Sequence, residues 1–525
     1  MVFGAYFVIS LFRLLQLTPG SYDLGIYTEF VRQLSQLHAP IDDVMGPGFN
    51  LEGDHFQIAV GVIAPFFRLF PSPATLLFFQ ALFAALSVFP VVTAAFLLAG
   101  RSTGRLIGFA YGFSWGLQQM INFDFHEIAL AVPLVAFSVS ALVRRRPWAT
   151  IAWALPLVFV KEDQGFTVAA IGVAIGATAA FPRLLPVRAA SPARSPARPW
   201  RARLRLPARL GGRLLAGGDP WGYGYVALWG GLFLVAWGLF WSTFAITVII
   251  PHFNPLHEYR YWETAGGSAG GKPLSVGALF SQTGTGWPTK LTTVVMLLLP
   301  TAFTALGSPV TLLVIPSLVL RFLSTNTNYW GTGFHYNATV MPILFIAAAE
   351  AIGRWRRARA LAWRAAPGGL GPGRTGPFGS RSGRGEGLRG LVHSARTGAA
   401  RHGGAMMAAV AVALAFQFPL SSLWQGATYK LNAHVAADDA AMAVVPDGAT
   451  VTTTLDLLAP LAARTDTFWI GNPGNPATQY IVFDGPNSGY SPSVTSVPQF
   501  IARLYPHDRY VPVFDRNNVY VFRRN

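Results

Sequence analysis

The sequences Tyr22-Asp23-Leu24-Gly25-Ile26-Tyr27 and Gly53-Asp54-His55-Phe56 form the two ends of one polar segment. It lies between the first apolar run, Val2–Leu17, and the next run that is long enough to cross a bilayer, Ala74–Gly100. Most ionisable groups that neither packing nor topology explains can be placed on the same side of a membrane as this segment. The first loop, residues 18–73, is therefore the predicted active face.

The composition indicates a polytopic membrane protein. Of the 525 residues, 52% are hydrophobic and only 12% are charged, against roughly a quarter charged in soluble proteins. The net charge of +17 would suit nucleic acid, but the basic loops lack the interleaved aromatic residues of a base-stacking surface. Retention of positive loops in the cytoplasm explains the charge, so no nucleic acid partner is expected. The absence of cysteine excludes disulfides and thiolate metal sites.

Eleven apolar runs are predicted to cross the membrane, which makes the membrane part all-α. Phe56–Phe70 is not counted among them, because Pro65 interrupts it and it carries Arg68; these features are typical of an interfacial or re-entrant helix. The predicted spans are Val2–Leu17, Ala74–Gly100, Leu106–Ile121, Ile128–Val143, Trp148–Val160, Gln164–Phe181, Trp221–Ile250, Leu291–Leu306, Val310–Phe322, Ala338–Gly353 and Ala405–Leu423.

The basic connections predict the orientation. With eleven spans, four of them fall on one side and hold 25 of the 40 lysine and arginine residues, so that side is predicted to be cytoplasmic. They are Arg101 with Arg105, Arg144-Arg145-Arg146, residues 182–220 and residues 354–404. The two long tracts are rich in Pro, Gly, Ser and Arg and lack apolar periodicity, so we expect disordered linkers. Residues 1–353 then form the membrane domain, and residues 405–424 its last transmembrane helix.

Residues 425–525 are predicted to form a small extracytoplasmic α/β domain. Its apolar fraction is lower, and strand-like runs alternate with helix-like ones. We expect strands at Thr450–Thr454, Thr467–Ile470 and Tyr480–Phe483, a helix at Pro498–Leu504, and a hairpin of Tyr510–Phe514 with Val519–Phe522. Its aromatic residues are expected in the core or on the sheet rather than in a sugar-binding platform.

Polar residues that suit chemistry collect on the predicted outer face. An ion-coupled transporter needs ionisable groups or broken helices near the bilayer midplane, and the predicted spans are nearly free of charge. An enzyme that acts on a lipid-linked substrate needs such groups at the level of the lipid headgroups. The candidates for substrate or phosphate binding are Asp54, His55, Lys161, Glu162, Arg260, His335 and Tyr336.

Asp23 directly follows the first span in an apolar setting. Partial loss of water would raise the basicity of its carboxylate, as a general base acting on an acceptor hydroxyl requires. The alternative is a helix cap, since aspartate before an apolar-periodic run such as Leu24–Leu37 is a preferred N-cap. The spacing alone leaves both readings open.

A divalent cation site is a further hypothesis. Asp124 and His126 alternate with phenylalanines, so in an extended segment both polar side chains share one face. Glu127 could add a third ligand, because the first two alone are too few to define a site. Lys161 is the one lysine in the first half of the chain and suits a phosphate, although a turn neutralised by its acidic neighbours is the plainer reading.

Two further motifs also have more than one possible role. Asp54-His55 suits substrate orientation, metal binding or a plain helix cap. His335-Tyr336 suits a phosphate contact or an aromatic-belt anchor at the membrane interface.

Together these motifs resemble those of the bacterial membrane proteins grouped as domain of unknown function 2079. The matching stretches are Tyr22–Tyr27, Gly53–Phe56, Phe123–Glu127, Lys161–Asp163 and His335-Tyr336. That family in turn resembles the GT-C integral membrane glycosyltransferases, which use polyprenyl-phosphate sugars on the outer face of the membrane. The shared features are a long first outer loop, an aspartate just after the first span, interfacial helices and a C-terminal domain. This chain lacks the second acidic neighbour of the commonest GT-C pattern.

The resemblance implies a function. Asp23 would be the base of a glycosyltransferase in the bacterial plasma membrane, with a polyprenyl-phosphate-linked sugar and membrane lipid as partners. Lys161 would stabilise the phosphate leaving group, together with Arg260 or with a cation held by Asp124 and His126. The alternatives are a non-catalytic protein for lipid handling or transport and an envelope-assembly scaffold.

Overall fold

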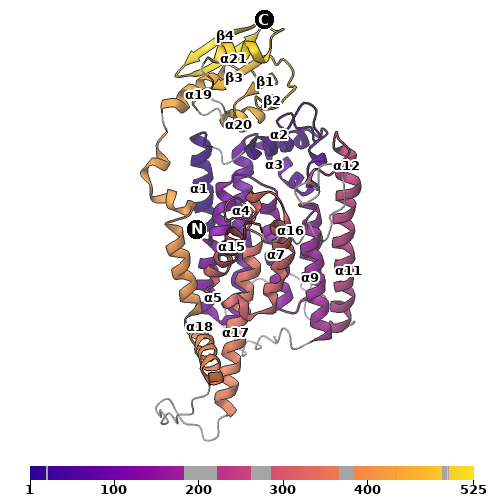
Figure 1. Ribbon diagram of the computed structural model, residues 1–525, viewed down its shortest axis with the longest axis vertical. Helices are drawn as coiled ribbons and strands as arrows, with labels where there is room; N and C mark the ends of the chain where they lie inside the picture. Colours follow the sequence, from indigo (N-terminus) through magenta and orange to yellow (C-terminus); the bar gives the residue numbers. More distant parts are fainter. Residues whose placement is uncertain are drawn as a thin grey trace, which may run out of the picture.

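The computed structural model describes residues 1–18, 22–181, 222–261, 285–365, 384–431, 433–486, 494 and 496–525. Within these residues the protein is a bundle of helices that carries a small sheet-containing domain at one end (Figure 1). The sequence predicts both parts. The predicted linker at residues 182–220 lies outside the described residues.

Twelve helices of eight or more residues make up the described part of the bundle. They are α1 (Val2–Leu15), α4 (Pro73–Ala99), α5 (Arg101–Gly112), α6 (Trp115–Asn122), α7 (Ile128–Val143), α8 (Pro147–Ala154), α9 (Gln164–Ala180), α11 (Tyr223–Phe244), α15 (Trp287–Leu298), α16 (Ile315–Leu323), α17 (Val340–Ala365) and α18 (Arg384–Ala415). Short turns connect or extend them: η3 (Leu155–Phe159), η5 (Ala245–Ile249), α12 (Ile250–Phe253), η6 (Leu299–Thr301), η7 (Thr304–Gly307), η8 (Pro309–Val314), η9 (Thr327–Tyr329), η10 (Pro419–Trp424) and η11 (Gly426–Tyr429).

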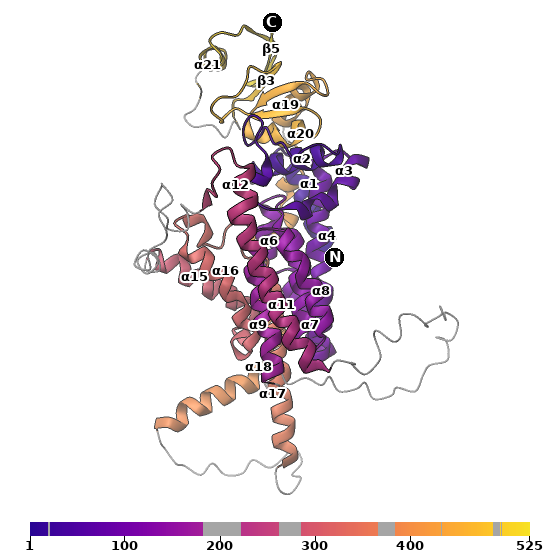
Figure 2. The ribbon, with the colours of Figure 1, turned by 90° about the vertical axis from the view of Figure 1, so that its right-hand side faces the viewer.

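Small residues allow the closest helix pair to form. A Cβ atom added to Gly238 of α11 would lie 2.2 Å from the carbonyl oxygen of Gly165 in α9, and one added to Gly231 would lie 2.6 Å from that of Gly172. Because no side chain separates these backbones, α9 and α11 run side by side over much of their length (Figure 2).

Two helical stretches of the described chain are long and apolar enough to cross a membrane, Pro73–Ala99 and Tyr223–Phe253. The eleven predicted spans are therefore not confirmed. Several are shorter or broken: Leu106–Ile121 becomes α5 and α6, which separate at Phe113 and Ser114. Others pass into 3₁₀ turns at prolines, as α8 does at Pro156 and α15 at Pro300, because proline supplies no backbone N–H.

The second basic tract differs from the prediction. Helix α17 continues to Ala365 and α18 begins at Arg384, so parts of residues 354–404 are helical; residues 366–383 lie outside the described chain. Alanine and arginine are strong helix formers. Arg356 also joins the helices, donating to the carbonyl of Ala400 at 2.6 Å and to Thr103 Oγ1 of α5 at 2.8 Å. The free ends of α17 and α18 project from the end of the bundle opposite the sheet (Figures 1 and 2).

The first loop forms a layer of short helices beneath the sheet-containing domain. It contains α2 (Asp23–Ser35), η1 (Leu51–Gly53), η2 (Ile58–Ile63) and α3 (Ala64–Leu69). The stretch predicted as interfacial, Phe56–Phe70, is the bent pair of η2 and α3, which lies beside α2 (Figure 1). Its side chains Val62, Phe66 and Leu69 are exposed.

The C-terminal domain is a five-stranded mixed sheet in the order β2-β1-β3-β5-β4. Strand β1 is parallel to β2 and β3, whereas β5 is antiparallel to β3 and β4. The elements are β1 (Thr450–Thr453), β2 (Asp466–Trp469), β3 (Tyr480–Asp484), β4 (Tyr510–Arg516), β5 (Val519–Arg524), α19 (Ala433–Ala443), η12 (Leu455–Leu457), α20 (Leu458–Ala462) and α21 (Val497–Leu504). The predicted strands, hairpin and short helix are therefore confirmed.

Two apolar layers hold the sheet together. Val451, Val482 and Val521 pack with α19 on one face, and Ile481 and Phe522 are among the residues that pack with α21 on the other. These side chains are all at most 2% exposed. Alternate residues of β3 and β5 thus face opposite layers, as the period of a strand requires.

The C-terminal domain docks on the first loop through α20. A Cβ atom added to Gly25 of α2 would lie 2.9 Å from Leu458 Cβ, so glycine permits this close approach. The indole of Trp469 stacks on Tyr22 with 5.5 Å between ring centroids. Arg32 also pairs with Asp466 at 2.8 Å. The docking fixes the start of α2, where Asp23 lies.

Candidate functional site

Eight of the eleven candidate residues line one polar cavity of about 150 Å³ between the first loop and the ends of the bundle helices. They are Asp23, Asp54, His55, His126, Lys161, Arg260, His335 and Tyr336. Glu127 and Glu162 lie behind the lining and contact it. Segments far apart in sequence therefore meet at one place, as the predicted topology requires.

Asp23 is the first residue of α2. Tyr22 occupies the N-cap position, and its side chain makes no capping hydrogen bond. Asp23 therefore does not act as the N-cap of this helix, which is one of its two predicted roles. Its carboxylate lines the cavity, with Oδ2 3.9 Å from His126 Nε2. Burial and, next, the negative charge of Glu127 raise the pKa of Asp23 to about 7. The group is therefore poised to exchange a proton near neutral pH.

Lys161 is held by a buried carboxylate. Its ammonium lies 2.8 Å from Glu127 Oε1 and 3.3 Å from His55 Nε2. The other oxygen of Glu127 accepts from the hydroxyl of Tyr27, and His126 Nδ1 lies 2.5 Å from it. Burial opposes the charge on Glu127, but His126 and Lys161 outweigh it and hold its pKa well below the usual range. Glu127 is thus a fixed counter-charge for the lysine.

Glu162 holds His55 and the start of the next segment. Its Oε1 lies 2.8 Å from His55 Nδ1 and accepts from Tyr259 at 3.1 Å, while Oε2 accepts from the backbone N–H of Phe56 at 3.2 Å. Burial lowers the pKa of His55, but the negative charge of Glu162 outweighs it and the net pKa is raised. Glu162 therefore fixes the orientation of the imidazole ring, and the Nε2 atom of His55 faces Lys161.

Two imidazoles that line the cavity stack on each other. The rings of His126 and His335 are 3.5 Å apart between centroids and inclined by 24°. Burial lowers the pKa of His126 to about 4, and burial with the neighbouring His126 lowers that of His335 well below its usual value. Both rings are therefore neutral at pH 7. The adjacent Tyr336 lies 4.2 Å from His335, centroid to centroid.

Asp54 and Arg260 form the rim. Asp54 accepts from the hydroxyl of Tyr261 at 3.1 Å, and Arg260 approaches it at 3.5 Å. The side chain of Arg260 is 54% exposed, so a solvent-accessible cation lies in the wall of the cavity. The ring of Tyr261 stacks on His55 at 4.5 Å, which joins the rim to the Glu162 group.

The predicted cation site at Asp124, His126 and Glu127 does not form. Asp124 Oδ1 lies 3.3 Å from Arg13 Nε of α1, and Asp124 does not line the polar cavity. The segment is not extended as predicted, because Asp124 has φ +66° and the chain turns there. In the described residues, the three groups do not bring ligand atoms to a common point.

A second, mainly apolar cavity of about 220 Å³ adjoins the first. The two share His55, Lys161, Tyr261, Tyr329, His335 and Tyr336 in their walls. The apolar cavity extends from them between α9, η5 and α16, where it is lined among others by Phe166, Ile246 and Leu320. Lys161 therefore faces both a polar and an apolar space.

Three tyrosines of the site, Tyr27, Tyr259 and Tyr261, are not among the residues predicted from the sequence. Tyr27 bonds Glu127 and Gln57, and Tyr259 and Tyr261 bond Glu162 and Asp54. A signal was present, because Tyr27 ends the first quoted motif and the other two flank Arg260. Their distances in sequence from the carboxylates they bond concealed the contacts.

The fold is a bundle of helices, two of them long and apolar enough to cross a membrane, with a polar site beneath a small α/β domain. The chain belongs to the family described as "Predicted membrane protein (DUF2079)", whose model matches residues 13–367. This match confirms the family resemblance that the motifs indicate. No curated protein matches the chain.

Solved structures similar to the chain include two of ArnT from Cupriavidus metallidurans. The structure described as bound to undecaprenyl phosphate is 14% identical, with a TM-score of 0.49, over 99% of this chain and 97% of that chain. The structure described as the apo state is 13% identical, with a TM-score of 0.46, over 95% of this chain and 92% of that chain.

Proposed function

We propose that the protein transfers a sugar from a polyprenyl-phosphate donor to an acceptor hydroxyl at the outer face of the plasma membrane. One observation carries the proposal: a carboxylate with a pKa of about 7, Asp23, lies in a polar cavity that shares a wall with an apolar one. The apolar space suits the isoprenoid chain of such a donor. The polar space suits its sugar, its phosphate and the acceptor.

In this mechanism Asp23 is the general base. The acceptor oxygen attacks the anomeric carbon, its proton passes to Asp23, and the bond between that carbon and the phosphate oxygen breaks. Polyprenyl phosphate leaves with the electron pair, and direct displacement inverts the anomeric centre. A base is most effective when its pKa lies near the working pH, which is the case for Asp23.

Lys161 and Arg260 are the proposed phosphate-binding residues. Lys161 lies in the walls of both cavities, so its ammonium stands where a lipid phosphate would pass from one to the other. An ammonium has three N–H donors, and the contacts with Glu127 and His55 occupy two. Arg260 would release its long contact with Asp54, 3.5 Å, and bind the phosphate instead.

The remaining candidates position these groups or contact the substrate. Glu162 orients His55, whose Nε2 lies 3.3 Å from the ammonium of Lys161, so both would hold the lysine in place. Asp54 and Tyr336 line the polar cavity and suit hydrogen bonds to sugar hydroxyls. The neutral rings of His126 and His335 provide a flat wall for a sugar face.

A transfer assay tests the proposal. Reconstituted protein, given polyprenyl-phosphate sugars labelled in the sugar and an extract of the cell envelope as acceptor, should release polyprenyl phosphate and label the extract. The rate should fall roughly tenfold per pH unit below about 7, where Asp23 is protonated, and level off above it. A protein that only handles lipid, the alternative that the apolar cavity alone supports, would bind the donor without consuming it.

The proposed orientation is testable because the chain contains no cysteine. Arg503, on α21 of the C-terminal domain, and Arg359, near the projecting end of α17, are both exposed. In intact cells an impermeant maleimide should label Arg503→Cys and leave Arg359→Cys unlabelled until the membrane is permeabilised. The reverse pattern would put the polar cavity on the cytoplasmic side and refute the proposed site of action.

A further inference from the structure

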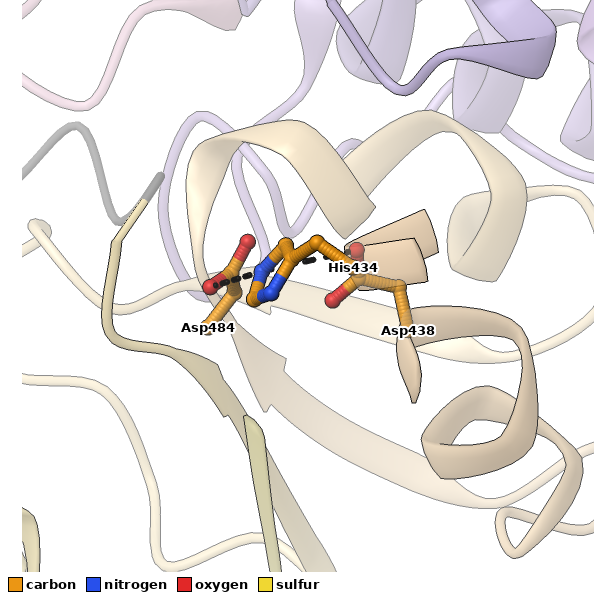
Figure 3. A group of neighbouring side chains, drawn as sticks. All are labelled: His434, Asp438 and Asp484. Atoms are coloured by element: carbon orange, nitrogen blue, oxygen red, sulfur yellow. Dashed lines mark hydrogen bonds and ion pairs between the residues drawn. The ribbon is translucent and has the colours of Figure 1, made fainter. Parts of the chain in front are cut away.

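A second cluster of ionisable groups lies in the C-terminal domain, outside the residues that the family model matches. His434 and Asp438 lie one turn apart on α19, and Asp484 ends β3 (Figure 3). His434 Nε2 is 2.8 Å from Asp484 Oδ1 and 3.7 Å from Asp438 Oδ2. One ligand atom from each residue lies within 4.8 Å of the others. The imidazole thus stands between two carboxylates.

The fold gathers these groups for simple reasons. Residues four apart on a helix share one face, so His434 and Asp438 both project from α19 toward the sheet. Strand β3 is the centre of the sheet, and α19 packs against it and against β5. A third carboxylate, Asp456 of η12, is linked to Asp484 through Thr454, whose hydroxyl donates to Asp456 Oδ1 at 3.0 Å and accepts from the backbone N–H of Asp484 at 3.2 Å.

The carboxylates lack the partners that buried charges require. Asp438 and Asp484 are fully buried and Asp456 is 5% exposed. Within the part of the chain that the structure describes, neither carboxylate oxygen of Asp438 has a hydrogen-bond partner, and one oxygen each of Asp456 and Asp484 also lacks one. Figure 3 shows the Asp438 carboxylate directed toward His434. Such groups are normally paired or bound to a metal, and one imidazole supplies at most a single positive charge.

We propose that His434, Asp438 and Asp484 bind a divalent cation of the Mn²⁺ or Zn²⁺ class, with Asp456 as a further ligand. Carboxylates favour Mg²⁺, Ca²⁺ and Mn²⁺, whereas imidazole favours Zn²⁺ and other transition metals, so the mixed set selects ions that accept both donors. A doubly charged ion cancels two of the three negative charges of the cluster. It also occupies the carboxylate oxygens that have no protein partner.

Proton binding is the competing way to neutralise the cluster. Carboxylate and imidazole ligands bind a metal only in their deprotonated forms, so protons compete with the cation and its affinity should fall as the pH is lowered.

The site has a structural consequence. Asp456 lies two residues before Leu458, which contacts Gly25 beside Asp23. A cation bound to Asp456 would tie η12 and α20 to the sheet and so stabilise the face that docks on α2. This role does not depend on sugar transfer, and its test needs no activity measurement.

The test uses the full chain purified in detergent, stripped of metal with a chelator and titrated with Mn²⁺, Zn²⁺ or Ca²⁺ in a calorimeter. One equivalent of Mn²⁺ or Zn²⁺ should bind in preference to Ca²⁺ and slow hydrogen exchange in α19, η12 and the end of β3. Failure of Mn²⁺ and Zn²⁺ to bind to the folded protein at millimolar concentration would refute the site. Preference for Ca²⁺ would refute the proposed class of ion.

Asp438→Asn and Asp439→Asn form a matched pair. The two aspartates are neighbours on α19, but Asp438 is buried in the cluster and Asp439 is exposed. Asp438→Asn should weaken cation binding by about 100-fold or more, beyond the roughly 10–100-fold that loss of an outer-shell partner costs, and Asp439→Asn should leave it unchanged. Asp438→Asn should also be at least as stable as the metal-free wild type, because a neutral amide replaces a buried carboxylate whose ionic contact with His434 is long, 3.7 Å. Equal binding by both variants would overturn the proposal.

Discussion

Asp23→Asn should lower the rate of sugar transfer by about 10²–10⁴-fold, the usual contribution of a general base. The amide has nearly the shape of the carboxylate but cannot accept the proton of the acceptor hydroxyl. The measurement is the initial rate of polyprenyl phosphate release, at saturating donor and at pH 8, where Asp23 is mostly ionised.

The same variant should not lose stability. Because the pKa of Asp23 is raised from 3.8 to about 7 in the folded protein, the folded state holds its proton more tightly than the unfolded state. The ionised group therefore costs stability, and this cost grows as the pH rises from about 4 to 7. Asparagine removes it, so the unfolding temperature at pH 8 should be equal to or higher than that of the wild type.

Asp43→Asn is the control. Asp43 lies in the same loop, where it accepts from the backbone N–H of Gly48 at 2.8 Å, and it lines neither the polar nor the apolar cavity. Its replacement should leave the rate within a few-fold of the wild type. Wild-type rates for Asp23→Asn, or an equal loss in both variants, would remove the catalytic role of Asp23 and favour the lipid-handling alternative.

The parts that the sequence predicts best are those where local pattern and topology agree. The strands of the C-terminal domain follow from β-branched runs between turns such as Pro446-Asp447-Gly448. Placing the polar loops on one predicted side brings Asp23, His55 and Lys161 together, and these three side chains do line one cavity. The number of spans is not confirmed, and the side of the membrane stays a prediction.

Other features depend on backbone detail that periodicity does not contain. The left-handed conformation of Asp124 turns its side chain to Arg13, whereas an extended segment would direct it with His126. For the cluster of the C-terminal domain, the sequence shows two of the residues at helical spacing, because His434 and Asp438 are four residues apart. Its other half, Asp484, needs the order of the strands, because β3 lies between β1 and β5.

Glu127→Gln should destabilise the protein by about 3–5 kcal/mol, the cost of leaving a buried charge without its partner. Glu127 is fully buried and contacts Lys161 at 2.8 Å, while the lysine side chain is only 15% exposed. Glutamine keeps the size of the side chain but not its charge. Thermal or denaturant-induced unfolding of the purified protein in detergent measures the loss of stability, with Asp43→Asn as the control.

A double-mutant cycle separates loss of the charge pair from a general defect in packing. Lys161→Met removes the ammonium, so in Glu127→Gln/Lys161→Met neither charge remains to be neutralised. The double variant should be more stable than Glu127→Gln alone and should recover most of the loss, because a buried pair replaced by uncharged groups is often tolerated. If the two losses simply add, Glu127 does not act as the counter-charge of Lys161, and the lysine would be free to take any anion that enters the cavity.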